Sequence, residues 1–183
     1  MSFRMFCSAC GALLPGAPPV TCPTCRTSHW RDPKPCASAL VTQSGRLLMV
    51  KRNHEPWIGC WDIPGGFCGT NEHPIATAER EVREEAGLTI RITGFLGMWP
   101  DVYDRSVEEN VQKPTLNIYF FGVPADGLST YADPDEVSAL GWFPPENLPQ
   151  QIAFPHHITA VLKAWSQAYL SGQTVTPLLD RPT

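Results

Sequence analysis

The chain has 183 residues, of which 43% are hydrophobic and 17% charged, and its formal net charge at pH 7 is −4. This composition is typical of a globular protein, and the length suits one ordinary domain with a small additional module. The negative charge disfavours a broad nucleic-acid-binding surface, which would need many Lys and Arg side chains to neutralise phosphates. No apolar run approaches the length that a membrane-spanning helix requires.

Two pairs of cysteines mark the N-terminal segment. Cys7 and Cys10 form one C-x2-C pair, and Cys22 and Cys25 form a second pair after eleven intervening residues. Two such pairs can place four thiolates at the corners of a tetrahedron, the arrangement in which structural Zn²⁺ is held. We predict a structural zinc ribbon at residues 1–30, which needs its metal to fold because so short a segment buries little surface. A redox pair, or a ribbon that has lost its metal, is the alternative.

The total of seven cysteines and the first residues bear on the compartment. Seven is an odd number, and the N-terminus contains no long apolar segment of the kind that directs secretion. A disulfide framework is therefore not expected. We expect a reducing, cytoplasmic environment instead. His29 could replace one cysteine as a zinc ligand, although a single His at the end of a module is more often a surface residue.

A proline-stiffened connector at residues 31–35 precedes a region of regular hydrophobic periodicity. Short apolar runs, rich in β-branched and aromatic residues, alternate there with Gly, Pro and polar turns, which is typical of strands. A tight turn at Ser44 and Gly45 joins the first two runs. Strands are expected at residues 36–43, 46–52, 90–99, 115–123 and 137–143.

Two segments have helical periodicity. In the first, residues 74–86, Pro74 suits the first turn and Gly87 suits the C-terminal stop. The second covers residues 156–170. Its expected apolar stripe consists of Ile158, Val161, Leu162, Trp165 and Tyr169. Strands and two helices without a regular β-α-β alternation favour an α+β fold with a mixed sheet.

The first helix concentrates carboxylates on one flank. Glu81, Glu84 and Glu85 share that flank when the residues are placed on a helical wheel, and Arg80 lies one turn before Glu84. Such acids are often no more than a solvated helix face. Three acids within five residues also repel one another, however, and a hard divalent cation bound by oxygen atoms would relieve that repulsion.

The segment before the helix favours the metal site. Gly66 is followed after five residues by Glu72, and after seven more by the run Arg80 to Leu88 with the sequence REVREEAGL. This pattern resembles the Nudix box, G-x5-E-x7-R-E-U-x-E-E-x-G-U, where U is apolar, at every specified position. The resemblance extends over about residues 31–150.

Similarity to Nudix hydrolases implies an α/β/α sandwich with a mixed sheet, here preceded by the ribbon. It implies three segments: the zinc ribbon at 1–30, the Nudix hydrolase domain at 31–150, and a C-terminal helix and tail at 151–183. It also implies hydrolysis of a nucleoside diphosphate linked to another group. The implied ligands of a catalytic Mg²⁺ or Mn²⁺ are Glu81, Glu84, Glu85 and the Gly66 carbonyl, with Arg80 and Glu72 orienting them.

The general base is not fixed by the box. Glu81 could serve while it contacts the metal, or a loop carboxylate could serve instead. We favour Glu136 among the loop acids, because it stands just before a strand and would be better positioned. The loop candidates are Glu108, Glu109, Asp135 and Glu136.

The second group of the substrate is suggested by the ribbon, which also precedes the Nudix domain in family members acting on NADH, ADP-ribose or FAD. Arg52 is a candidate for phosphate binding. Trp57, Trp99 and Tyr103 are candidates for stacking on a base or flavin, although such aromatics are more often core residues. The motif usual in NADH-hydrolysing members is reduced here to Trp99–Pro100.

Three functions remain open. A metal-dependent diphosphatase acting on a dinucleotide-like small molecule is the first, and the intact acidic box favours it. A non-catalytic nucleotide-sensing module that uses the ribbon to contact a partner is the second. A house-cleaning hydrolase of nucleoside triphosphates is the third. The C-terminal helix and the ribbon are both plausible contacts for a homodimer.

Overall fold

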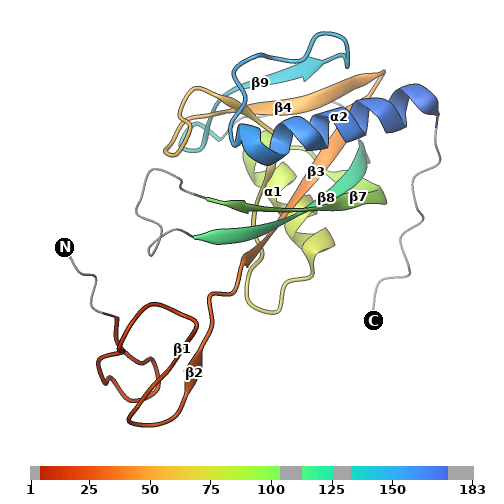
Figure 1. The fold of residues 1–183 in the computed structure, drawn as a ribbon. Coiled ribbons are helices and arrows are strands. Elements are labelled where there is room, and N and C mark those ends of the chain that lie inside the picture. Colours follow the sequence, from red (N-terminus) through yellow and green to blue (C-terminus); the bar gives the residue numbers. More distant parts are fainter. Residues whose placement is uncertain (1–4, 104–112, 126–132, 173–183) are drawn as a thin grey trace.

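The computed structural model describes residues 5–103, 113–125 and 133–172. Figure 1 shows their arrangement, in which a small N-terminal module lies below a sandwich of helices and strands. The helices are α1 (Pro74–Ala86) and α2 (Pro155–Ser171). The strands are β1 (Val20–Thr21), β2 (Ser28–His29), β3 (Lys34–Gln43), β4 (Arg46–Arg52), β5 (Trp61–Asp62), β6 (Gly65–Phe67), β7 (Ile90–Val102), β8 (Pro114–Pro124) and β9 (Val137–Phe143).

The main sheet is mixed, as predicted. Its strand order is β5-β4-β3-β8-β7, with β6 paired to β3 and β9 paired to β4. The β3–β8 pair is parallel, whereas the other pairs in this sheet are antiparallel. The predicted turn between β3 and β4 is present, but the two strands pair only beside it, at Thr42–Leu47 and Gln43–Arg46. Beyond the turn they separate, and β3 pairs with β8 while β4 pairs with β9 and β5.

The alternation of side chains along β3 builds a core on each face of the sheet. Ala37, Ala39 and Val41 pack with the apolar stripe of α1 on one face. Leu40 points to the other face, where it packs with α2. Figure 1 shows α2 on the near side of the strands and α1 beyond them. The arrangement is the α/β/α sandwich that the sequence predicts.

The ends of α1 coincide with those expected from its terminal residues. Pro74 occupies the first turn, and Gly87 adopts a left-handed φ of 65° that ends the helix. In α2, the predicted apolar stripe is buried from Ile158 to Trp165, whereas Tyr169 is 44% exposed. Neither helix of the described residues is long and apolar enough to cross a membrane.

The N-terminal module is held by few contacts of its own. Its hairpin pairs Val20 with His29 and Thr21 with Ser28. Cys7, Leu14 and Cys22 form a small buried cluster beneath it. So little apolar burial is a weak source of stability, which agrees with the expectation that a metal contributes to folding.

Candidate active site

Two glutamates of α1 are buried against the sheet. The apolar stripe of the helix faces β3, which turns Glu81 and Glu85 toward the edge of the sheet at β6. Glu81 is 9% exposed and Glu85 is 7% exposed. The backbone N–H of Gly65 donates to Glu85 Oε2 at 3.0 Å. The alternative interpretation, a solvated helix face, is therefore wrong for these two carboxylates, because they lie inside the protein.

The glycines of β6 allow this close approach. A Cβ at Gly66 would overlap the Glu81 carboxylate and lie 2.5 Å from its Cδ. A Cβ at Gly65 would lie 2.7 Å from the carbonyl oxygen of Ala37. Only glycine at both positions lets β6 pair with β3 while α1 presses its carboxylates against the strand.

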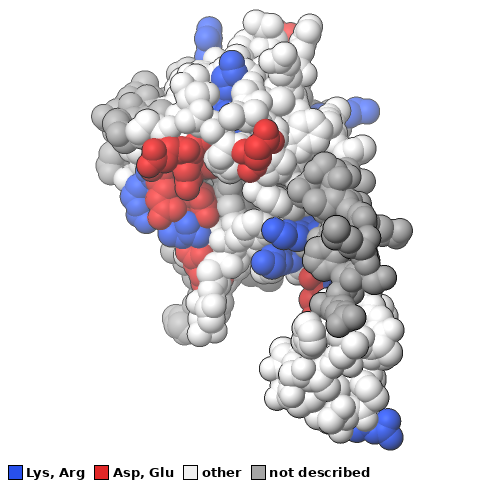
Figure 2. Space-filling view, turned by 90° about the vertical axis from the view of Figure 1, so that its left-hand side faces the viewer, with Lys and Arg blue, Asp and Glu red and all other residues white. Residues whose placement is uncertain are grey.

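Arg80 binds three acids at once. Its Nε donates to Glu72 Oε1 at 2.7 Å, and its Nη1 donates to Glu81 Oε1 at 2.8 Å and to Glu84 Oε2 at 2.7 Å. A second contact with Glu72, from Nη2 at 3.0 Å, makes that pair bidentate. Figure 2 shows Asp and Glu side chains gathered on one face of the molecule beside Lys or Arg side chains.

The pKa values of these acids diverge. Hydrogen bonds from Arg80 and from the Gly69 N–H lower the pKa of Glu72 to about 2. Burial raises the pKa of Glu81, an effect that the Arg80 charge opposes. Burial and the charge of Asp62 hold the pKa of Glu85 well above its usual range. Glu81 and Glu85 are thus carboxylates whose charge the protein alone compensates poorly.

Glu136, the predicted base, stands near this cluster. Its side chain is exposed just before β9, and its charge contributes to raising the pKa of both Glu81 and Glu85. The backbone N–H of Asn53 donates to its carbonyl oxygen at 2.9 Å, which ties its loop to the end of β4. Asp135 is exposed beside it, whereas Glu108 and Glu109 lie outside the described residues.

The acids fit a hard divalent cation in their chemistry, since buried carboxylates with raised pKa values gain most from a bound cation. Their oxygen atoms do not converge in this conformation. Among the residues that the structure describes, Cys7, Cys10, Cys22 and Cys25 form the one group of three or more ligand atoms within 4.8 Å of each other. Arg80 instead holds Glu81 and Glu84, and Glu84 is half exposed, with room to turn.

A pocket opens beside the cluster and shares its glycines. It has an empty volume of about 490 Å³, open mouth included, and reaches from Gly65 and Gly66 to the N-terminus of α2. Its rim is aromatic. The Tyr103 ring lies 5.3 Å from that of Phe67 and 5.7 Å from that of Phe154, measured between ring centroids.

The floor of the pocket contains a buried polar chain. Asp101 Oδ2 lies 2.6 Å from His157 Nδ1, and His157 Nε2 lies 2.8 Å from the Tyr119 hydroxyl. Burial raises the pKa of Tyr119 well above its usual range. Asn117 lies on the same floor and donates from Nδ2 to Thr115 Oγ1 and to the Trp99 carbonyl.

Of the four predicted substrate-binding residues, two line the pocket and two do not. Tyr103 and Arg52 line the pocket, but the Arg52 guanidinium already binds Asp62 at 3.1 Å and the Pro56 carbonyl at 2.8 Å. Trp57 is 37% exposed and packs edge-on against Phe154, outside the pocket lining. Trp99 packs against Tyr119, also outside the lining.

The sequence analysis missed the floor residues Asp101, Asn117, Tyr119 and His157, and the rim residue Phe154. A sequence signal was available for His157 alone. His157 lies on the buried face of α2, so it is a polar residue at a position that would otherwise favour an apolar one. Asp101 lies in β7 beyond the strand expected at residues 90–99, so no such signal existed for it.

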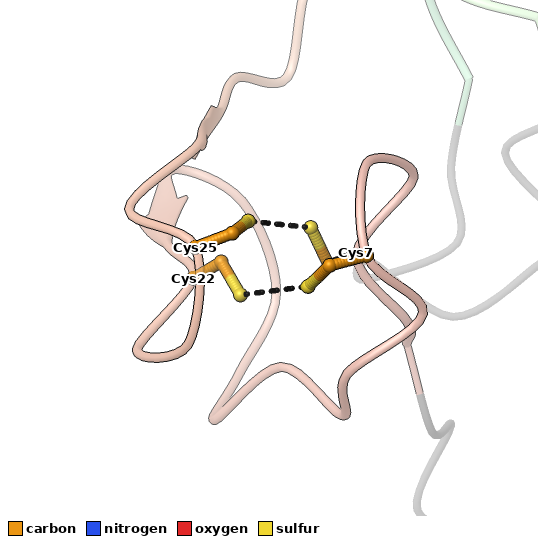
Figure 3. A group of neighbouring side chains, drawn as sticks. Cys7, Cys22 and Cys25 are labelled. Atoms are coloured by element: carbon orange, nitrogen blue, oxygen red, sulfur yellow. Dashed lines mark hydrogen bonds between the residues drawn. The ribbon is translucent and has the colours of Figure 1, made fainter.

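The four N-terminal cysteines converge as predicted (Figure 3). The Sγ atoms of Cys7 and Cys25 are 3.5 Å apart, and those of Cys10 and Cys22 are 3.7 Å apart. Zn–S bonds of about 2.3 Å place tetrahedral sulfur atoms about 3.8 Å apart, whereas a disulfide needs about 2.05 Å. The cluster therefore fits a zinc ribbon. His29 Nε2 lies 3.2 Å from Cys7 Sγ, at the edge of the cluster.

Comparison with known proteins adds family and fold. The NUDIX domain model matches residues 32–163. An ADP-ribose pyrophosphatase of Methanocaldococcus jannaschii is 27% identical over 68% of this chain and 69% of its own length. The NAD-capped RNA hydrolase NudC of Vibrio cholerae is 26% identical over 79% of this chain, which spans about half of that protein (51%).

Solved structures agree with these matches. A MutT NUDIX hydrolase from Burkholderia pseudomallei has a TM-score of 0.61 at 26% identity, covering 72% of this chain and 95% of its own. A NUDIX hydrolase from Nitrosomonas europaea has a TM-score of 0.71 at 22% identity and covers 96% of both chains, so its likeness extends to the N-terminal module.

Proposed function

The chain belongs to the NUDIX domain family and is a Nudix hydrolase, and on this premise we propose that it cleaves the pyrophosphate bond of a dinucleotide-like substrate such as ADP-ribose, NADH or FAD. The observation that carries the proposal is the pair of buried carboxylates, Glu81 and Glu85, with a pocket beside them. Buried acids with raised pKa values are expected where a cation and a phosphate are to be bound.

Mg²⁺ or Mn²⁺ would be held by Glu81, Glu84, Glu85 and the Gly66 carbonyl. When bound, such an ion neutralises pyrophosphate charge and lowers the pKa of a water molecule. Arg80 and Glu72 are positioning residues in this proposal. Their bidentate ion pair keeps the Arg80 guanidinium in contact with both Glu81 and Glu84, so that the acids stay on one side of the helix.

Glu136 is proposed as the general base. A water oxygen attacks one phosphorus atom, Glu136 accepts the proton of that water, and the bridging oxygen leaves with the other phosphate. Its exposure and its place near Glu81 and Glu85 support this role, because a base must reach water beside the metal ligands. Glu81 is the alternative base.

The pocket is proposed to bind the heterocycle of the substrate. Tyr103, with Phe67 and Phe154, offers ring faces on which a planar base can stack. Arg52 lies at the same pocket with its guanidinium 5.1 Å from the Phe154 centroid, where a phosphate would share its charge with Asp62. Trp57 and Trp99 lie outside the pocket lining and support it by packing against Phe154 and Tyr119.

The zinc ribbon at residues 1–30 is proposed as a structural module, with Zn²⁺ held by the four cysteines. The hydrolase domain of residues 31–150 would act with the C-terminal segment, since Phe154 and His157 at the start of α2 line the pocket. The family match, which reaches residue 163, supports that cooperation.

A substrate screen tests the proposal. The purified protein, with Mg²⁺ or Mn²⁺, is incubated with ADP-ribose, NADH, FAD, diadenosine polyphosphates and nucleoside triphosphates, and the products are identified. The proposal predicts that a dinucleotide-like compound is cleaved fastest and yields two monophosphates. Preferred release of pyrophosphate from a triphosphate would instead support the house-cleaning function, and no turnover with any compound would support a sensor.

A further inference from the structure

The polar chain on the pocket floor has one direction when the His157 ring is neutral. The carboxylate of Asp101 only accepts hydrogen bonds, so the proton of a neutral His157 ring resides on Nδ1, 2.6 Å away. His157 Nε2 must then accept, and the Tyr119 hydroxyl donates to it across 2.8 Å. The single proton of Tyr119 is therefore used inside the protein and is not offered to the pocket.

Tyr119 is the end of this chain that faces the pocket. Ser38, Tyr119 and His157 all line the pocket and are each at most 9% exposed. With the Tyr119 hydroxyl proton directed toward His157, the Tyr119 oxygen keeps lone pairs for a ligand.

Asn117 also presents a hydrogen-bond acceptor to the pocket. Its Nδ2 donates to the Trp99 carbonyl at 3.1 Å and to Thr115 Oγ1 at 3.0 Å. A carbonyl cannot donate, so this orientation of the amide is fixed and Oδ1 is the atom that remains. Oδ1 has no hydrogen-bond partner among the described residues. Every fully buried side-chain oxygen of those residues has a partner, so Oδ1 is not fully buried and faces the pocket that Asn117 lines.

We propose that this floor selects a heterocycle that carries an exocyclic amino group, such as adenine, over the counterpart that carries an oxo group, such as hypoxanthine. The amino group donates one N–H to Asn117 Oδ1 and the other to the Tyr119 oxygen. An oxo group there would place lone pairs against lone pairs. The inference deepens the proposed function and rests on it, in that the pocket is taken as the heterocycle site. Asp101 and His157 are positioning residues, because they act through Tyr119.

The rim does not make this distinction. Phe67, Tyr103 and Phe154 can stack on an amino-purine and an oxo-purine equally well. The choice between the two bases is therefore assigned to the floor alone. Rim variants should change the affinity for both bases, whereas floor variants should change the preference between them.

Equilibrium binding of AMP and IMP, measured by calorimetry with Mg²⁺ present, tests the inference. Neither compound holds a pyrophosphate bond, so the result does not depend on hydrolysis, and a failure of the proposed enzymatic activity would show separately in the substrate screen. A mispaired polar group at a buried site predicts that AMP binds about tenfold to hundredfold more tightly than IMP. Equal affinities, a preference for IMP, or no binding of either compound at millimolar concentration would overturn it.

Variants of the chain make the test specific. Tyr119→Phe keeps the buried ring and removes the hydroxyl, so AMP affinity should fall toward that of IMP. Tyr169→Phe removes a hydroxyl from a residue outside the pocket and should leave the ratio unchanged. Tyr103→Leu on the rim should weaken AMP and IMP alike.

Asp101→Asn provides the sharpest variant. The Asn amide can donate to His157 Nδ1, which then accepts, and Nε2–H donates to Tyr119. The chain reverses and turns a hydroxyl proton toward the pocket, so the preference should shift toward IMP. Circular dichroism establishes that the variant is folded. A folded Asp101→Asn protein that binds both compounds more weakly, with the AMP preference intact, would contradict the chain mechanism.

Discussion

The carboxylate of Glu81 occupies the space beside Gly66 that a Cβ would fill. Strand β6 therefore contributes no side chain to this contact, and the Glu81 side chain of α1 packs directly on the Gly66 backbone. The contact requires glycine at 66 for steric reasons, independently of any ligand that the Gly66 carbonyl would bind.

Gly66→Ala is predicted to displace Glu81. The added methyl group cannot be accommodated without moving either β6 or the carboxylate, and overpacking of this kind costs about 1–3 kcal/mol of unfolding free energy. Turnover should fall as well, because the displaced acid is a proposed metal ligand. Urea unfolding and steady-state kinetics measure the two effects. Gly16→Ala is the control, since a Cβ there meets nothing within 4 Å. Unchanged turnover in Gly66→Ala would contradict the placement of Glu81.

Glu72 links stability to pH. An ordinary Glu in the unfolded chain has a pKa of about 4.3, whereas Arg80 and the Gly69 N–H lower the pKa of folded Glu72 to about 2. A lowered folded pKa means that the stabilisation is fully present above about pH 4.3 and is lost as the pH falls toward about 2. The wild type should therefore lose more stability than Glu72→Gln between about pH 5 and pH 2.5 in metal-free urea unfolding.

A control removes an unrelated acid. Glu146→Gln changes an exposed residue in the turn before α2, and this variant should lose as much stability as the wild type over the same pH interval. Parallel pH profiles for the wild type and Glu72→Gln would show that the Arg80–Glu72 pair does not stabilise the fold.

Much of this site could be predicted from the sequence because its signals are local. The bounds of α1 follow from Pro74, Gly87 and an apolar stripe, all within one segment. The three acids of the box lie on this same helix, so their spacing alone showed that they share one flank. The C-x2-C pairs likewise carry their geometry within a few residues.

The pocket floor could not be predicted, because it is assembled by long-range pairing. Asp101 comes from β7, Tyr119 from β8 and His157 from α2, and only the antiparallel pairing of β7 with β8 and the packing of α2 bring them together. The predicted β3–β4 hairpin did not indicate the strand order of the sheet, since those two strands separate after the turn. No local pattern records which strand becomes a neighbour.

Zinc content tests the N-terminal cluster. The wild type should contain one zinc ion per chain, and Cys22→Ser should lose it, because a buried ligand with its Sγ 3.7 Å from that of Cys10 is removed. Cys60→Ser changes a cysteine outside the cluster and should retain the metal. Metal analysis of the purified proteins gives the result. A wild type without zinc would refute the assignment.

Glu136→Gln separates proton transfer from metal binding. Loss of a general base typically lowers kcat by about 10²- to 10⁴-fold, whereas the affinity for Mg²⁺ should change little because the proposed ligands remain. Asp135→Asn, an adjacent exposed acid, should retain activity. If Glu136→Gln turns over at the wild-type rate, the proton acceptor is another group, and Glu81 becomes the first candidate.

The most direct measurement is the Mg²⁺ dependence of pyrophosphate-bond hydrolysis in Glu85→Gln, compared with Glu79→Gln on the same helix. Glu85 is buried and has its pKa raised well above the usual range, so a bound cation should depend on its charge. We predict that Glu85→Gln loses turnover by at least about 10²-fold, as expected when several kcal/mol of transition-state stabilisation are removed, and binds Mg²⁺ more weakly, while Glu79→Gln changes little. Wild-type turnover and Mg²⁺ affinity in Glu85→Gln would contradict the account.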